Sequence, residues 1–205
     1  MLIVNFKKYK KGKKAVELAK TIEKYDKKAL IALLPREIIN IKGKTSLRVL
    51  SQYVKNKEDI YISKKYNVYG SLLNHSDYPI SVDKIKDINK NASNIRVKLI
   101  ICASSLKMAK KVKSLNPKPW AIAYEDPKLI GTGRSITEYK KDNVKEFVKL
   151  LKGTGIFALC GAGVSTAEDV KMAKNLGCQG VLISSALAKV RLSKAIKLLK
   201  EIKDS

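Results

Sequence analysis

Residues 120–133 read Trp-Ala-Ile-Ala-Tyr-Glu-Asp-Pro-Lys-Leu-Ile-Gly-Thr-Gly. The apolar run from Trp120 to Tyr124 is typical of a buried strand, and Glu125 follows directly at its end. The next residues form a loop that contains Gly131 and Gly133. Enzymes built on parallel barrels place a catalytic carboxylate and a mobile covering loop in this way. A surface acid before a turn would give the same local pattern, so the rest of the chain must distinguish the two interpretations.

Outward from this stretch, short apolar runs alternate with amphipathic, lysine-rich segments. We predict strands at 2–6, 30–34, 60–62, 69–73, 97–102, 120–124, 156–160 and 181–184. We predict helices at 13–28, 45–53, 81–89, 106–115, 142–151, 166–176 and 192–202. Alternating strands and helices favour a parallel α/β fold, and eight such units fit the smallest (β/α)₈ barrels. No linker or low-complexity tract interrupts the pattern, so we expect residues 1–205 to form one domain.

One predicted unit departs from the regular spacing of the strands along the chain. Ile60 and Gly70 are only ten residues apart, whereas a parallel crossover usually needs a dozen or more residues and a helix. The six residues 63–68 span at most about 20 Å when extended. The predicted fold is therefore a (β/α)₈ barrel that is shortened and irregular between strands 3 and 4, unless the strand at 60–62 is misassigned.

The chain is strongly basic, with 43 Lys and Arg residues, 18 Asp and Glu residues and a formal charge of +25. Such a charge attracts nucleic acid, acidic membranes and phosphorylated metabolites. The lysines follow the helical segments and do not alternate with aromatic residues. We therefore expect a solvated basic surface and no specific nucleic-acid partner.

Membrane, metal and location predictions follow from the remaining composition. No apolar run reaches ~18 residues, which predicts no membrane span, and the first residues lack a secretory-signal pattern. Cys102, Cys160 and Cys178 lie in apolar segments with no metal-ligand spacing to the only histidine. We expect structural thiols, no bound metal and a reducing, cytoplasmic location.

Polar residues follow several of the predicted strands. Asn5 and Lys7 follow the first strand, and His75 follows the fourth. The loops after the last two strands carry Gly161-Ala162-Gly163 and Ser184-Ser185. Barrel enzymes commonly bind phosphate with these two loops, where small residues let backbone N–H groups approach an anion. Tight turns would require the same glycines, so this pattern alone leaves both interpretations open.

Taken together, five segments resemble the triosephosphate isomerase family in its short archaeal form. They are Asn5-Phe6-Lys7-Lys8-Tyr9, Leu72-Leu73-Asn74-His75-Ser76-Asp77, Glu125 with Leu129-Ile130-Gly131-Thr132-Gly133, Cys160-Gly161-Ala162-Gly163-Val164-Ser165-Thr166, and Gly180-Val181-Leu182-Ile183-Ser184-Ser185. The segments occur in the family's order and run through nearly the whole chain.

The resemblance implies interconversion of dihydroxyacetone phosphate and D-glyceraldehyde 3-phosphate through an enediol, in glycolysis and gluconeogenesis, without a cofactor. This family is itself a standard worked case for tuned acid and base groups. It implies that Glu125 is the base and that neutral His75 polarises the carbonyl. It also implies that Lys7 supplies positive charge for the phosphate and the developing enediolate, and that Asn5 orients the oxygen. The implied substrate-binding residues are Asn5, Lys7, Ile130, Gly131, Gly163, Ser184 and Ser185.

The chain departs from the family pattern at three places. Asp77 stands where the family has Glu, and Asp126 stands where it has Pro beside the base. Asp126 would either raise the pKa of Glu125 or point to solvent.

The third departure is a missing segment between Ser63 and Tyr69. The family has a long third loop and a helix there, with Gln-His, Gly and Thr-Gly elements that contact a neighbouring subunit. Homo-oligomers are usual in the family, but we expect a monomer or an altered assembly here, with weakened activity. The alternative is an impaired barrel that binds phosphorylated ligands or RNA.

Overall fold

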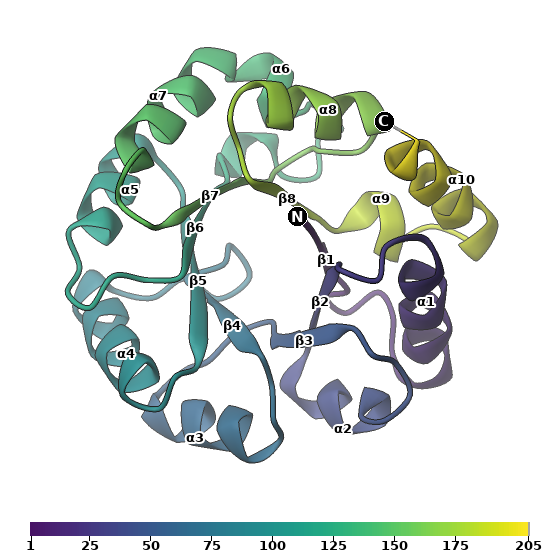
Figure 1. Ribbon diagram of the computed structural model, residues 1–205, viewed down its shortest axis with the longest axis horizontal. Coiled ribbons are helices and arrows are strands. Elements are labelled where there is room, and N and C mark those ends of the chain that lie inside the picture. The colour runs from purple at the N-terminus through teal and green to yellow at the C-terminus, as the bar shows by residue number, and fades with distance from the viewer. Residues whose placement is uncertain (205) are drawn as a thin grey trace.

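The computed structural model describes residues 1–204, and in it the strands form a closed parallel barrel surrounded by helices (Figure 1). Each strand pairs with the next along the chain, and β8 closes the barrel by pairing with β1. The strands are β1 (Leu2–Asn5), β2 (Leu30–Leu33), β3 (Arg48–Ser51), β4 (Gly70–Leu73), β5 (Lys98–Ala103), β6 (Ala121–Tyr124), β7 (Phe157–Cys160) and β8 (Gly180–Ile183). The predicted α/β barrel class is confirmed.

The longer helices connect successive strands on the outside of the barrel. They are α1 (Gly12–Tyr25), α3 (Lys57–Lys65), α4 (Val82–Asn94), α5 (Leu106–Lys113), α7 (Lys141–Leu151), α8 (Ala167–Asn175) and α10 (Leu192–Lys203). Shorter helical pieces lie in the loops: α2 (Ile38–Ile41), α6 (Ile136–Tyr139), α9 (Ser185–Ala188) and the 3₁₀ turns η1 (Pro35–Glu37) and η2 (Pro127–Leu129). A single turn shows no helical periodicity, and none of these short pieces was predicted. No helix in residues 1–204 is both long and apolar enough to cross a membrane.

The strands are apolar along their whole length because both of their faces are buried. On β1, Ile3 packs inside the barrel, whereas Leu2 and Val4 pack outward under the helices. This alternation divides the core into an inner layer within the barrel and an outer layer beneath the helices. The inner layer fills the barrel, so any ligand must bind at one of its ends.

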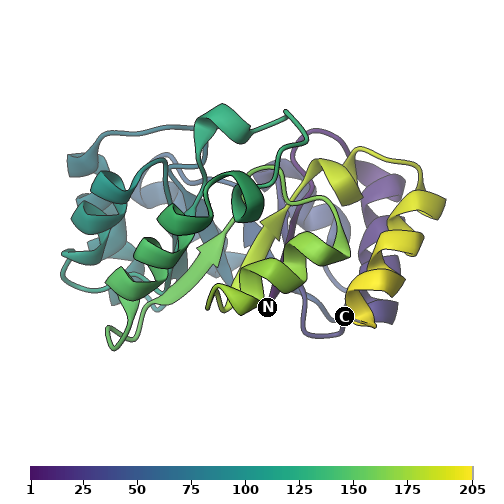
Figure 2. The ribbon, with the colours of Figure 1, turned by 90° about the horizontal axis from the view of Figure 1, so that it is seen from above.

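All strand C-termini lie at the same end of the barrel because the sheet is entirely parallel. Figure 2 shows the loop after β6, with η2, at this end and opposite the labelled N- and C-termini. The loop after β6 therefore covers the end at which the polar residues that follow the strands gather.

The third strand was misassigned in the sequence analysis. Residues 60–62 belong to α3, and the predicted helix at 45–53 contains β3 instead. In β3, Leu50 is fully buried inside the barrel and lies opposite Gly70 of β4. Ile60 is also fully buried, but it packs in the outer layer. A short apolar run does not distinguish a strand from one face of a short helix, which explains the error.

Correct placement of β3 removes the expected irregularity between strands 3 and 4. The nine-residue helix α3 connects β3 to β4 as an ordinary crossover. Residues 52–56 join β3 to α3. The crossover between β3 and β4 therefore contains a helix that the sequence analysis did not predict.

Candidate functional site

A cavity of about 350 Å³ opens at the C-terminal end of the barrel. Every residue that the sequence analysis assigned to the site lines it: Asn5, Lys7, His75, Glu125, Ile130, Gly131, Gly163, Ser184 and Ser185. A larger hollow, of about 500 Å³, lies outside the barrel beside α1, and Lys13, Lys20 and Lys44 are among its lining residues. Residues from the C-terminal ends of several strands converge on the first cavity, which makes it the candidate site.

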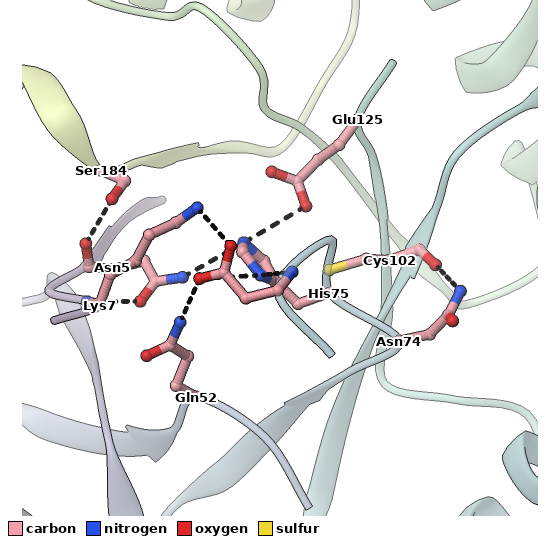
Figure 3. A network of polar contacts seen from close by, with 9 residues as sticks. Asn5, Lys7, Gln52, Asn74, His75, Cys102, Glu125 and Ser184 are labelled. Atoms are coloured by element: carbon pink, nitrogen blue, oxygen red, sulfur yellow. Dashed lines mark hydrogen bonds and ion pairs between the residues drawn. The ribbon is translucent and has the colours of Figure 1, made fainter. Parts of the chain in front are cut away.

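Asn5 is the innermost polar residue of the site and is fully buried at the end of β1. Its Oδ1 accepts a hydrogen bond from the backbone N–H of Lys7 at 3.1 Å. The amide therefore turns Nδ2 toward His75, whose Nε2 lies 3.4 Å away (Figure 3). Ser184 donates its hydroxyl to the backbone carbonyl of Asn5 at 2.8 Å, which ties the end of β8 to the end of β1.

His75 is oriented by its own turn. The backbone N–H of Asp77 donates to His75 Nδ1 at 3.2 Å, so Nδ1 carries a lone pair and the proton of the neutral imidazole lies on Nε2. Nε2 of His75 and Nδ2 of Asn5 are then two adjacent donors with no acceptor between them. An oxygen atom in the cavity could accept hydrogen bonds from both.

Glu125 projects from the end of β6 with only 9% of its side chain exposed. Its Oε2 lies 3.9 Å from His75 Nε2 and has no hydrogen-bond partner among the described residues. Gly161 leaves room for this carboxylate, since a β-carbon there would lie 2.9 Å from Glu125 Oε1. A buried carboxylate with an unoccupied oxygen is well suited to accept a proton from a ligand.

A buried thiol packs beside Glu125. Burial raises the pKa of Cys102 well above its usual value, and the charge of Glu125 and a hydrogen bond with that carboxylate add to the effect. Cys102 therefore stays protonated and is a poor nucleophile. The thiol supports the carboxylate without competing for a ligand.

Lys7 supplies the positive charge nearest to these groups. Its backbone has a φ of 46°, in the left-handed region that side-chain-bearing residues seldom occupy. Lys7 Nζ lies 3.1 Å from Asp77 Oδ1, and Asp77 Oδ2 accepts a hydrogen bond from Gln52 Nε2 at 2.9 Å. The shorter Asp77 side chain therefore still reaches the lysine.

The opposite wall of the cavity contains backbone and a second cation. Gly163 has a φ of +74°, and a β-carbon there would lie 1.9 Å from the carbonyl oxygen of Arg134. The N–H of Ile136 donates to Ala162 at 3.0 Å, so the end of the loop after β6 rests on the loop after β7. Lys189, which follows α9, also lines this wall. Glycine loops and a lysine together make a wall that attracts anions.

Asp126, which follows Glu125, is held by two partners of its own. Its side chain accepts a hydrogen bond from Lys128 N at 3.0 Å and so caps η2. Its other oxygen lies 3.8 Å from Lys140 Nζ. Only 15% of the Asp126 side chain is exposed, so the expectation that it points to solvent is wrong, and the carboxylate faces these two partners.

Sequence reasoning missed three residues near the site. Gln52 was missed because β3 was misassigned, and Lys189 because it is one of many lysines. Tyr9 lines the cavity with Lys189, whose Nζ lies 6.0 Å from the centre of the Tyr9 ring. Among residues 1–204 no three His, Cys, Asp or Glu side chains gather in a way that could hold a metal ion.

Comparisons with known proteins agree with the geometry. The family model described as triosephosphate isomerase matches residues 1–200. The triosephosphate isomerase of Pyrobaculum calidifontis is 32% identical over 207 residues, covering 93% of this chain and 90% of that protein. The Thermoplasma volcanium protein of the same name is 31% identical and covers 92% of each chain. A chain of a cube-shaped, highly porous designed protein cage has the same fold, with a TM-score of 0.70 at 14% identity over 98% of this chain and 70% of its own.

Proposed function

The chain belongs to the triosephosphate isomerase family, and we propose that it interconverts dihydroxyacetone phosphate and D-glyceraldehyde 3-phosphate with Glu125 as its catalytic base. This assignment of residues rests on one observation: Lys7, His75 and Glu125 converge on one cavity from three separate strand ends. We infer a cytoplasmic enzyme of glycolysis and gluconeogenesis that uses no cofactor.

Glu125 transfers the proton. The unpartnered Oε2 removes a proton from the carbon beside the carbonyl group and returns it to the neighbouring carbon. An enediol forms between the two transfers. Because the carboxylate is mostly buried and makes few hydrogen bonds, water does not weaken it as a base.

His75 and Asn5 stabilise the developing charge on oxygen. Nε2 of His75 and Nδ2 of Asn5 are adjacent donors, so a carbonyl oxygen between them would accept both hydrogen bonds. These bonds strengthen as the oxygen becomes negative in the transition state. Lys7 adds a full positive charge at the mouth of the same cavity.

The opposite wall binds the phosphate group. Gly131, Gly163, Ser184 and Ser185 bring backbone N–H groups to the cavity, and Lys189 contributes a charge. Ile130, in the loop after β6, lines the cavity and excludes water from the reacting atoms. Exclusion of water matters chemically because an exposed enediol phosphate eliminates its phosphate group.

A coupled isomerase assay tests this function. The wild type should turn over both triose phosphates, and Glu125→Asp should lower kcat by about a hundredfold because the shorter arm withdraws the base. Glu146→Asp is the matched control, since Glu146 lies on the exposed face of α7 with 56% of its side chain accessible. Absence of turnover in the wild type would refute the proposal. An equal loss of kcat in both variants would show that Glu125 is not the catalytic base.

A further inference from the structure

Gln52 lies outside the cavity but contacts the group that orients Lys7. We propose that Gln52 is a positioning residue that fixes the Asp77–Lys7 ion pair. This inference rests on the proposed isomerase function.

Asp77 has a different partner for each of its two oxygens. Oδ1 lies 3.1 Å from Lys7 Nζ, and Oδ2 accepts the hydrogen bond from Gln52 Nε2 at 2.9 Å. The Asp77 side chain is 38% exposed and lies in the loop between β4 and α4. Without Gln52 its carboxylate could rotate into solvent, and Lys7 Nζ would follow it.

Gln52 itself is rigidly placed. It is 1% exposed and directly follows β3, and its backbone N–H donates to Leu33 O at 2.7 Å, which extends the pairing with β2. Its Oε1 is buried without a hydrogen-bond partner among the described residues. An unpaired buried oxygen destabilises the folded chain. Gln52 therefore holds Asp77 through Nε2 at a cost in stability that an apolar side chain of the same size would avoid.

The loops that carry Gln52 and Asp77 are also joined by their next residues. Tyr53 follows Gln52, Tyr78 follows Asp77, and their ring centres are 3.8 Å apart at an angle of 33°. Lys55 Nζ lies 5.5 Å and 5.8 Å from the two ring centres. This Tyr53–Tyr78 pair fixes the short connection of residues 52–56 against the loop after β4.

Gln52→Leu tests the positioning role, with Gln179→Leu as the matched control. The Gln179 side-chain Oε1 accepts a hydrogen bond from Ala158 N at 2.6 Å, at the opposite end of the barrel. We expect kcat/KM of Gln52→Leu to fall about tenfold with Tm unchanged or higher, because the leucine removes an unpaired oxygen. Gln179→Leu should lower Tm without a selective loss of kcat/KM. Unchanged kcat/KM in Gln52→Leu, with an active wild type, would overturn the inference.

A double variant separates positioning from simple damage. Gln52→Leu combined with Asp77→Asn should lose no more activity than Asp77→Asn alone, because Gln52 acts through Asp77. Additive losses would contradict the inference. An inactive wild type would instead refute the proposed function.

Discussion

A β-carbon on Gly161 would lie 2.9 Å from Oε1 of Glu125, so the glycine after β7 sets the space available to the carboxylate after β6. The two residues are neighbours because β6 and β7 pair in register, with Tyr124 opposite Cys160. The position of Glu125 thus depends on a residue far from it in the sequence.

Gly161→Ala should displace Glu125 while the chain still folds. A contact of 2.9 Å is too short for a methyl group, so the carboxylate must move. We expect kcat to fall at least about tenfold, with a smaller change in KM, in the coupled assay. Gly180→Ala is the control, because its β-carbon would lie 2.5 Å from Met1 O at the far end of the barrel. Equal kcat loss in both variants would point to general damage.

Lys7→Met should remove the charge that faces the substrate. We expect kcat/KM to fall by about a thousandfold, through both kcat and KM, since the lysine is assigned to the phosphate and to the enediolate. Lys8→Met is the matched control, because Lys8 is the exposed next residue and lies outside the cavity. Similar steady-state constants for Lys7→Met and the wild type would exclude Lys7 from the mechanism.

Lys189→Ala should weaken substrate binding more than the chemical step. Lys189 lines the wall assigned to the phosphate, far along the chain from Lys7. We expect KM and the inhibition constant of inorganic phosphate to rise severalfold, with kcat nearly unchanged and a weaker dependence of KM on salt. Lys194→Ala on the exposed face of α10 should change none of these. An unchanged phosphate inhibition constant would argue against the role.

Asp169 should make stability dependent on pH. Burial opposes its ionisation, but hydrogen bonds from Ser165, Ser135 and Thr166 outweigh that effect and lower its pKa. A lowered pKa means that the ionised group stabilises the folded chain fully above the ordinary value of 3.8, and that this stabilisation is lost as pH falls through the folded-state value.

Asp169→Asn should therefore have a lower Tm than the wild type at neutral pH, and the difference should narrow in acid below the ordinary Asp pKa. Asp142→Asn is the control, because 95% of the Asp142 side chain is exposed. Thermal unfolding across the acid range measures both. A Tm difference that stays constant down to the most acidic pH would contradict the assignment of the lowered pKa to Asp169.

The sequence predicted the barrel well where strands were buried on both faces. Residues 120–124 and 97–102 are continuous apolar runs, and the structure places β6 and β5 there. It failed at β3, where Arg48 is exposed, Val49 is half-buried and only Leu50 and Ser51 are buried. A strand with so few buried apolar residues shows no clear hydrophobic periodicity. Residues 48–51 form a strand because they pair with β2.

The motifs predicted residues that line the cavity, but not the contacts between them. Motifs indicated Asn5, Lys7, His75 and Glu125, and the structure places all four around one cavity. Gln52 could not be predicted, since its role depends on a hydrogen bond to Asp77 across two loops. The sequence indicates it only as a polar residue that follows β3, and β3 itself was misassigned.

Exchange of substrate hydrogen with solvent tests the central claim most directly. Dihydroxyacetone phosphate in deuterated water, followed by proton NMR, should gain deuterium on the carbon beside its carbonyl with the wild type. With Glu125→Gln this exchange should fall by at least about a thousandfold, because the amide cannot accept the proton. Exchange by Glu125→Gln at the wild-type rate would contradict the account and show that another group removes the proton.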